Sequence, residues 1–258
     1  VMLAPLRLVK EMLVEVALPP LRLVKARPDE KRLVDVALVR IVPDRLVNPV
    51  ITRFVEVILL PLTFVNEKFV DVLLINTVDV AKKLVVVTGA GMSAESGVST
   101  FRDSNGLWEN HDIMDVASPL GWQKNPELVL AFYNKRRAQL KEVEPNLGHQ
   151  LLVELEPYLD VQIITQNVDN LHERAGSKNV LHLHGELTQI RGEHSPEESI
   201  YWTEDIALGD VNENGEQLRP DIVWFGEAVP KLTEATYIAA QADFMIIIGT
   251  SLQVYPAA

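Results

Sequence analysis

The stretch Lys83–Asp103, KLVVVTGAGMSAESGVSTFRD, holds the strongest structural signal in this chain. It begins with a short, apolar, β-branched run at Leu84–Val87, and a run of this length before glycines is typical of a buried central strand. The spacing G-x-G-x-x-A follows (Gly89, Gly91, Ala94), in which backbone without a Cβ can approach a pyrophosphate at a helix N-terminus. A tight strand-to-helix turn without any ligand would use the same glycines, so the spacing alone leaves both interpretations open.

Composition narrows the class of protein. The chain has 258 residues, of which 47% are apolar, and this allows one large domain or two smaller ones with a sizeable core. A formal net charge of -12 argues against a nucleic-acid surface, which needs a basic face. There is no cysteine, so disulfides and thiolate chemistry are excluded. Neither a signal peptide nor a bilayer-spanning apolar run is indicated, so we expect a cytoplasmic protein that binds no membrane and no nucleic acid.

Residues 1–81 have a composition unlike the remainder. They lack Gly, Ser, His, Gln, Trp and Tyr, and they are rich in Val and Leu. They also repeat themselves: PLRLVK occurs at Pro5–Lys10 and Pro20–Lys25, and FVEVILL at Phe54–Leu60 is echoed by FVDVLLI at Phe69–Ile75. The alternation is typical of strands, which the prolines would interrupt. The segment is either an appended β-rich module or an artefactual extension, and we favour the second because a folded segment this long normally needs glycine in its turns.

A helix is predicted to begin after Asn125, its N-cap, and to continue to about Val143. Tyr133 and Arg136 lie three residues apart on this helix and therefore share a face. A guanidinium can bond both oxygens of a carboxylate and a phenol adds a further donor, so the pair suits a carboxylate receptor. A solvated basic patch is the alternative, because further basic residues adjoin the pair, and spacing alone favours that patch.

Polar side chains follow a second predicted strand, Val161–Thr165. Gln166, Asn167 and Asp169 come directly after it, at the carboxyl end of a parallel strand, where ligands bind in open α/β sheets. Their amide and carboxylate groups suit ribose hydroxyls and a carboxamide. The nearby His172 is interpreted as a structural or surface histidine.

A third strand is predicted at Val180–His184, directly before Gly185. An imidazole titrates close to neutrality and can take a proton from a hydroxyl at little cost. A lone histidine on a strand is usually a hydrogen-bonded structural residue, and we keep that interpretation for His182.

The predicted elements form an α/β fold, a doubly wound parallel, Rossmann-like sheet with a smaller inserted module. The remaining pieces are a helix at Leu147–Leu159, a short helix capped by Asn170 and closed by Gly176, a strand at Ile222–Phe225, a helix at Leu232–Ala242 and a strand at Phe244–Ile248.

Five blocks in this order resemble the sirtuins, the NAD-dependent protein deacylases. The blocks are GAGMSAESGVSTFRD with GLW at 106–108, TQNVDNLH at 165–172, HG at 184–185, PDIVWFGE at 220–227 and GTS at 249–251. The resemblance covers about two-thirds of the chain. It implies a catalytic domain at 82–258, with a small module from about 104–145 and 187–221, that ends before the last strands of the family.

The resemblance implies NAD as cofactor. The cofactor-binding residues that it implies are Gly89, Ala90, Gly91, Ser93, Glu95, Phe101, Arg102, Gln166, Asn167, Asp169, Gly249, Thr250 and Ser251. The segment 104–125 matches a loop that orders over NAD in the family. Asp103 is a departure, since family members usually have glycine there.

The resemblance also implies the reaction. The acyl oxygen of an acylated lysine attacks the nicotinamide ribose of NAD and expels nicotinamide, and the acyl group leaves as O-acyl-ADP-ribose. His184 matches the general base, and Asn167 and Asp169 match the residues that line the nicotinamide pocket. The acylated-lysine peptide or protein is then held by Val223, Trp224, Phe225, Gly226 and Glu227. FYNKRR resembles the motif with which one sirtuin class uses Tyr133 and Arg136 to select succinyl and malonyl groups.

Most sirtuins carry a zinc ribbon with two cysteine pairs in the segment that matches 188–219. This chain has no cysteine there, and a structural zinc site needs four ligands in close pairs. We therefore predict no metal, with the small module held by Tyr201 and Trp202 and by turns at Gly209 and Gly215.

Other functions remain open at this point. The same residues would suit a non-catalytic protein that binds NAD or ADP-ribose, an inactive fragment, or a mono-ADP-ribosyltransferase. We expect a monomer.

Overall fold

The computed structural model describes residues 35–42, 54–61, 82–98, 107–108 and 111–257. The chain divides into Val1–Leu33 and Val34–Ala258, and every described residue belongs to the second unit. Phe101, Arg102 and Asp103 lie outside the described residues, as do the repeats at 5–25 and 69–75.

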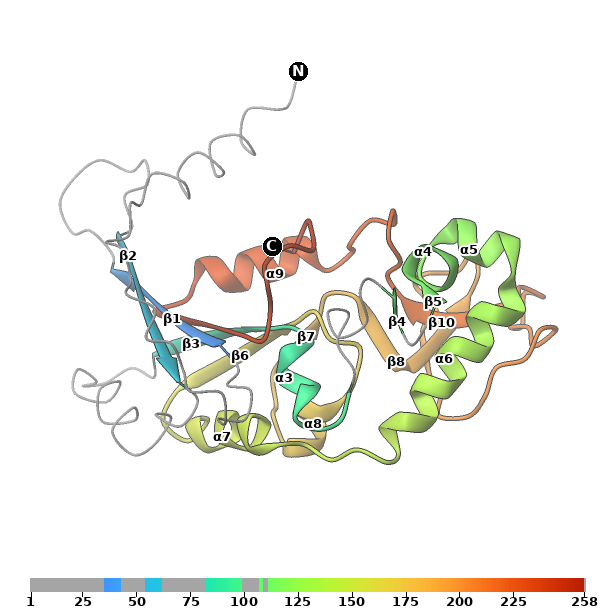
Figure 1. Ribbon diagram of the computed structural model, residues 1–258. Helices are drawn as coiled ribbons and strands as arrows, with labels where there is room; N and C mark the ends of the chain where they lie inside the picture. The colour runs from blue at the N-terminus through green and yellow to red at the C-terminus, as the bar shows by residue number, and fades with distance from the viewer. Residues whose placement is uncertain (1–34, 43–53, 62–81, 99–106, 109–110, 258) are drawn as a thin grey trace, which may run out of the picture. The chain divides into compact units, whose positions relative to one another are not determined.

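The principal sheet has the strand order β2-β1-β11-β3-β6-β7 (Figure 1). Its strands are β1 (Asp35–Val42), β2 (Phe54–Pro61), β3 (Lys83–Thr88), β6 (Asp160–Thr165), β7 (Val180–His182) and β11 (Phe244–Ile248). Strands β11, β3, β6 and β7 are parallel, which confirms the predicted α/β fold with a parallel sheet. Strand β1 pairs antiparallel with β11, and β2 pairs antiparallel with β1. Strand β7 is shorter than predicted, so that His184 lies beyond it.

The sheet is covered on both faces, as the apolar sequence of β3 requires. Leu84 and Val86 are fully buried in one cluster with residues of α7 (Leu147–Leu155). Val85, which points to the other face, is fully buried in a cluster with residues of α9 (Leu232–Ala240). A strand that is apolar on both faces is typical of a parallel sheet between helices. The two helices lie on opposite sides of the sheet in Figure 1, and both end earlier than predicted.

A second cluster of elements packs around its own core. Its elements are α4 (Ile113–Val116), α5 (Pro119–Lys124), α6 (Pro126–Leu140), β8 (Gly185–Gly192), β9 (Ile200–Tyr201) and β10 (Leu218–Ile222), with β10-β8-β9 forming an antiparallel sheet. Trp122, Tyr133, Ile190 and Trp224 belong to one buried apolar cluster there. We call this part the small module. The short elements α3 (Gly91–Ala94), β4 (Leu107–Trp108), β5 (His111–Asp112) and α8 (Leu171–Ala175) complete the described fold.

Helix α6 begins as predicted, because Asn125 Oδ1 accepts a hydrogen bond from Leu128 N at 3.1 Å. The predicted cap of α8 is wrong in detail. The side chain of Asn170 makes no cap hydrogen bond, and Asp169 Oδ1 accepts from Leu171 N at 3.2 Å instead. The end of α8 is as predicted, at a left-handed Gly176 with φ +110°.

The strand predicted at Ile222–Phe225 is wrong. Strand β10 ends at Ile222, and the chain then turns, because Trp224 N donates to Glu227 Oε2 at 2.8 Å. The Trp224 N–H is thereby bonded to a side chain and is not available for hydrogen bonding to a neighbouring strand. The apolar run VWF therefore reflects burial of Trp224 in the small module rather than a strand.

The cysteine-free segment of the small module is held only partly as predicted, with left-handed glycines at the expected turns, Gly209 and Gly215. Tyr201 is 68% exposed, so it contributes little packing, whereas Trp202 does pack against the module core. The carboxylate of Glu216 accepts hydrogen bonds from Ser195 Oγ at 2.7 Å and from Asn212 Nδ2 at 3.3 Å. Among the described residues, no group of three or more His, Cys, Asp or Glu side chains could hold a metal ion. In the same residues no helix is both long and apolar enough to cross a membrane.

Candidate functional site

Four parallel strands end level with one another, and this gathers the candidate site. In the register of the sheet, Ile248 of β11, Thr88 of β3, Thr165 of β6 and His182 of β7 are successive partners. The segments that follow them leave the sheet at its carboxyl edge, where ligands bind in open α/β sheets. The predicted cofactor and general-base residues that the structure describes lie in these segments or in α3.

The glycine loop after β3 packs backbone to backbone against the loop after β11. Gly89 N donates to Ile248 O at 3.0 Å, and Gly91 N donates to Gly249 O at 2.8 Å. A Cβ on Gly91 would lie 2.8 Å from Gly249 Cα, and a Cβ on Gly249 would lie 2.2 Å from Met92 N. Gly249 also has φ +64°, a conformation that favours glycine. Contact between the two loops therefore requires the glycines, whether or not a ligand approaches them.

Asn167 is held at three points. Its N–H donates to Thr165 Oγ1 at 3.0 Å, and its side-chain Nδ2 donates to Ser93 Oγ at 3.1 Å. Its carbonyl oxygen lies 2.9 Å from His182 Nδ1. Contacts from three different segments thus fix both the backbone and the amide of this residue.

Two neighbours of Asn167 add charge and hydrogen-bonding capacity. Asp169 is 4% exposed, and burial raises the pKa of its carboxyl group while the hydroxyl of Ser93 lowers it. The side-chain Nε2 of Gln166 is buried without a hydrogen-bond partner in the described part of the chain. A buried donor without a partner costs free energy, so this amide suits a ligand that brings an acceptor.

His184 is set up as a neutral imidazole. Its Nδ1 lies 3.1 Å from the carbonyl oxygen of Gln166, and a carbonyl only accepts, so Nδ1 carries the proton. Burial lowers the pKa of His184, which the hydrogen bond to Gln166 opposes. The ring is therefore uncharged near neutral pH, with the lone pair on Nε2, as a general base requires.

The backbone of His184 is also tied to the segment at 223–227. Val223 N donates to His184 O at 2.9 Å, and Phe225 N donates to Ala117 O at 2.9 Å. Phe225 is 39% exposed and Gly226 has φ +94°. This segment therefore runs from the imidazole towards the surface of the small module.

Arg219 and Glu227 brace the indole of Trp224. The guanidinium of Arg219 lies 3.3 Å from the centre of the Trp224 ring, and its Nη1 donates to Glu227 Oε1 at 2.9 Å. The indole Nε1 donates to Tyr133 OH at 3.1 Å. Tyr133 is fully buried, and burial raises the pKa of its hydroxyl, so the phenol is neutral. Because the indole is the donor, the phenolic proton points away from Trp224.

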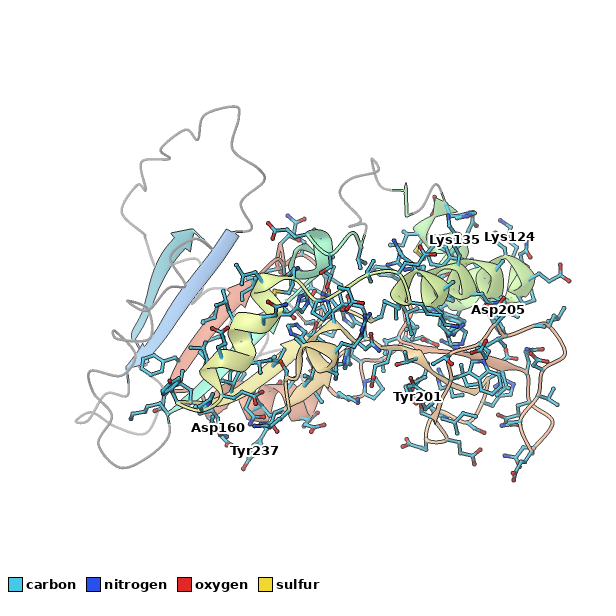
Figure 2. All side chains as sticks on the ribbon, turned by 90° about the horizontal axis from the view of Figure 1, so that it is seen from below. Lys124, Lys135, Asp160, Tyr201, Asp205 and Tyr237 are labelled. Atoms are coloured by element: carbon cyan, nitrogen blue, oxygen red, sulfur yellow. The ribbon has the colours of Figure 1, made fainter. Side chains whose placement is uncertain are left out.

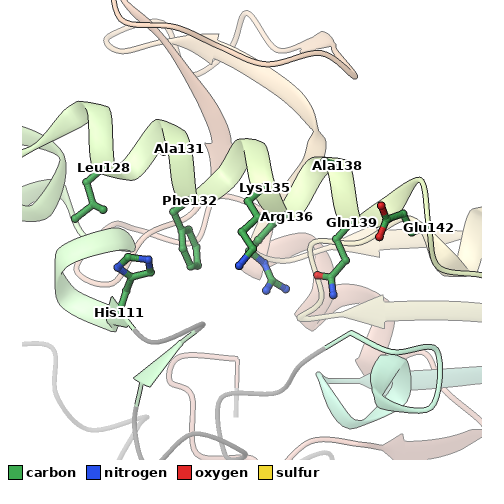
Figure 3. Close-up of a pocket in the computed structure, with 9 residues that line it drawn as sticks. All are labelled: His111, Leu128, Ala131, Phe132, Lys135, Arg136, Ala138, Gln139 and Glu142. Atoms are coloured by element: carbon green, nitrogen blue, oxygen red, sulfur yellow. The ribbon is translucent and has the colours of Figure 1, made fainter.

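A cavity of about 550 Å³ lies along α6 (Figure 3). Its lining residues are His111, Leu128, Ala131, Phe132, Lys135, Arg136, Ala138, Gln139 and Glu142. Phe132, Lys135, Arg136 and Gln139 project from α6 to the same side of the helix in Figure 3. Arg136 lines this cavity with 5% of its surface exposed, whereas Tyr133 is not among the lining residues. The structure thus brings Arg136 together with Lys135, and Tyr133 together with Trp224.

The other side of α6 is covered. Asn134 Nδ2 donates to Ile206 O at 2.9 Å, and Arg137 Nε donates to Leu187 O at 2.8 Å. Figure 2 shows Lys135 and Asp205 on different sides of this helix. The solvated basic patch considered for this helix is therefore not what the structure contains, since Arg136 and Arg137 are both buried.

The remaining predicted residues lie around the two loops. Ser93 is fully buried, Ala90 precedes α3, and Glu95 is exposed after α3. Thr250 Oγ1 accepts from Leu252 N at 3.2 Å, and Ser251 is exposed.

A polar network under the site was not predicted. Thr88 donates through its hydroxyl to Thr165 Oγ1 at 2.8 Å, and His172 Nε2 lies 3.1 Å from Thr88 Oγ1. His172 is 1% exposed, so it is structural and not a surface residue. The available signal was a threonine at the end of two apolar strands, β3 and β6.

Comparison with known proteins agrees with this geometry. Residues 89–256 match the Sir2 family. An NAD-dependent protein deacylase of Helicobacter pylori (strain ATCC 700392 / 26695) is 63% identical over 177 residues, which cover 69% of this chain and 77% of that protein. A protein of the same name from Bacteroides thetaiotaomicron is 56% identical over 183 residues, covering 69% of this chain and 78% of that protein.

Solved structures resemble the chain as well. A complex of a Sir2 homologue with NAD matches at 42% sequence identity with a TM-score of 0.63, covering 69% of this chain and 71% of that chain. The structure of Sir2Tm bound to a propionylated peptide matches at 32% identity with a TM-score of 0.57, covering 74% of this chain and 78% of that chain.

Proposed function

This chain belongs to the Sir2 family and is an NAD-dependent protein deacylase, and we propose that it removes succinyl and malonyl groups from lysine side chains. The cavity along α6 is the observation that carries this proposal. Two cationic side chains, Lys135 and Arg136, line it together with the apolar Leu128 and Phe132. An acyl chain that ends in a carboxylate has the complementary chemistry, with methylene groups before its charge.

Arg136 is the principal receptor in this proposal. A planar guanidinium can bond both oxygens of a carboxylate at once, and such charge-assisted pairs are stronger where water is excluded. Arg136 is almost fully buried, so it meets that condition. Lys135 adds positive charge at the rim. Tyr133, the second predicted receptor residue, does not line the cavity, and its hydroxyl accepts a hydrogen bond from the Trp224 indole.

NAD fits the carboxyl edge of the sheet. The unpartnered amide of Gln166 offers a buried donor, and the loops at Gly89–Gly91 and Gly249–Ser251 form one surface beside it. Asn167 and Asp169 would hold the nicotinamide side, with Ser93 keeping both side chains in place. When bound, NAD supplies a ribose carbon that accepts the acyl oxygen as nicotinamide leaves.

His184 acts as the general base in this proposal. Its Nδ1 proton is retained by the carbonyl of Gln166, so only Nε2 can take a proton from a ribose hydroxyl. Val223, whose N–H donates to His184 O, fixes the start of the peptide-holding segment Val223–Glu227 relative to the same imidazole. One backbone hydrogen bond thus positions the segment that holds the acylated-lysine substrate next to the general base.

The test is Arg136→Met with peptides that differ only in the acyl group. We expect kcat/KM for succinyl-lysine to fall about 100-fold, the loss of one charge-assisted pair, and kcat/KM for acetyl-lysine to stay within about threefold. Lys141→Met is the matched control, since Lys141 is an exposed cation at the end of the same helix. Equal losses for both acyl groups would remove the assignment.

A further inference from the structure

We propose that His182 is a positioning residue for this reaction, an imidazolium that Glu173 clamps against the backbone of Asn167. The proposal rests on the proposed deacylase function, because it concerns the loop that carries the nicotinamide-side residues. It assigns a role to a charge pair, a buried imidazole with a partly exposed carboxylate, that the reaction itself does not use.

Geometry determines the charge of the ring. His182 is the last residue of β7 and its side chain is 3% exposed. Its Nδ1 lies 2.9 Å from Asn167 O, and its Nε2 lies 2.8 Å from Glu173 Oε1 of α8. A carbonyl oxygen and an ionised carboxylate only accept hydrogen bonds, so both ring nitrogens must donate. Only the doubly protonated imidazole can make both bonds.

The charges around the ring favour the same state. Glu173 faces it from α8, Glu186 from β8 and Asp169 from the loop after β6, while His172 of α8 is neutral. Burial on its own would lower the pKa of His182, but the hydrogen bond and charge of Glu173 outweigh it and raise the pKa above its ordinary value. The clamp is therefore retained to a higher pH than an ordinary imidazole would allow, and it is lost as the pH rises through that raised pKa.

The clamp acts on the residues that touch substrate through the backbone of Asn167. Without His182, the carbonyl of Asn167 would lose its bond, while Thr165 and Ser93 would still hold the amide groups. The peptide unit between Asn167 and Val168 would then lose a restraint. The adjoining peptide unit carries the Gln166 carbonyl, which holds the Nδ1 proton of His184, so a backbone shift at Asn167 would reach the base as well.

Two neighbouring histidines show what an imidazole that is hydrogen-bonded at only one nitrogen looks like here. His149 Nε2 and His172 Nδ1 are buried without a hydrogen-bond partner among the described residues. Burial lowers the pKa of each ring, to about 4 for His149 and about 3 for His172, so both are neutral. His182 differs from them in having an acceptor at each nitrogen.

The experiment compares the full chain with Glu173→Gln. Glu144→Gln is the matched control, because Glu144 also pairs with α8, through Arg174 Nη2 at 2.9 Å, so its partner is a guanidinium and not an imidazole. The ¹⁵N NMR signals of the His182 ring, assigned with a His182→Asn variant, are followed against pH. The kinetic constants kcat and KM are measured against pH with succinyl- and acetyl-lysine peptides. The affinity for ADP-ribose is measured by calorimetry.

We expect the His182 ring of the unaltered chain to stay doubly protonated through neutral pH. In Glu173→Gln it should titrate at least about one pH unit lower, and kcat above neutral pH should fall about tenfold with both peptides while KM for peptide is unchanged. Glu144→Gln should behave like the unaltered chain. A neutral His182 ring at pH 6.5 in the unaltered chain, or kcat profiles that coincide for the two variants, would overturn the proposal.

The outcomes separate this proposal from the proposed function. If the acyl preference fails, the acetyl-lysine profile still reports the pH shift. If no acyl peptide is turned over at all, the NMR titration and the change in ADP-ribose affinity still report whether the clamp holds the loop.

Discussion

The two halves of the site are built by different means. At the carboxyl edge of the sheet, strand register and backbone hydrogen bonds place the residues, and two glycine loops lie against each other. Along α6, side chains that come mostly from this one helix line the cavity, and their positions depend on how the small module packs. We therefore expect the carboxyl edge of the sheet, called the cofactor side below, to tolerate little backbone change, whereas side chains of the cavity along α6, called the acyl side, can vary without loss of the fold.

The largest expected effect is on the cofactor side. Gly249→Ala would place a Cβ 2.2 Å from Met92 N, in a backbone conformation with φ +64°. We expect the free energy of unfolding to fall by about 4 kcal/mol or more, because neither loop can move without breaking sheet contacts. Denaturant unfolding measures it.

Gly209→Ala is the matched control for that change. Gly209 also has a positive φ, +99°, but a Cβ there would meet nothing within 4 Å. This substitution should lower the free energy of unfolding only by the strain of the left-handed conformation, about 1 kcal/mol. Equal losses for the two variants would show that loop contact does not restrain the cofactor side.

Acid should lower the free energy of unfolding, through two buried histidines beneath the cofactor side. The pKa of His149 is lowered to about 4 and that of His172 to about 3, mainly by burial, against an unfolded value of about 6.5. The unfolded chain therefore binds more protons below pH 6.5, and stability that is present above that pH is lost as the pH falls.

Between pH 7 and pH 5 we expect a loss of roughly 2 to 4 kcal/mol in the free energy of unfolding. Denaturation at several pH values measures it, and His172→Gln should flatten the slope, since one of the two imidazoles is removed. Because the raised pKa of His182 acts in the opposite direction, the difference between the two slopes is decisive, and a slope unchanged in His172→Gln would mean that this ring is charged or solvated in the folded protein.

The smallest expected effect is on the acyl side. Lys135 is exposed at the rim of the cavity, so its attraction for a succinyl carboxylate is screened by water and salt. Lys135→Met should raise KM for succinyl-lysine about two- to fourfold at low salt, with less effect at high salt and none on acetyl-lysine. Steady-state kinetics at two ionic strengths measure this, and a salt-independent loss with both substrates would point to damaged packing instead.

The sequence made the cofactor side largely predictable. Apolar runs predicted β3, β6 and β11, and polar residues after Thr165 predicted a ligand edge, because these signals are local and follow from strand burial. The packing of Gly91 on Gly249 was not predictable, since it joins residues far apart in the chain.

The acyl side was less predictable for the same reason. The spacing of Tyr133 and Arg136 indicated a shared face of α6, but not that Trp224 would take the hydroxyl of Tyr133 or that Lys135 would join Arg136 in a cavity. The side chains of a helix that packs on two partners can be divided between them, and spacing does not say how. The apolar run before Gly226 predicted a strand for a similar reason. The strand in fact ends at Ile222, because the Glu227 carboxylate accepts a hydrogen bond from Trp224 N.

The central claim is that this deacylase prefers acyl groups that end in a carboxylate. The most direct measurement is NAD-dependent nicotinamide release with otherwise identical succinyl-lysine and acetyl-lysine peptides, at equal enzyme and NAD. We predict a kcat/KM for succinyl-lysine at least about tenfold above that for acetyl-lysine. A higher value for acetyl-lysine, or release that does not depend on either peptide, would contradict it.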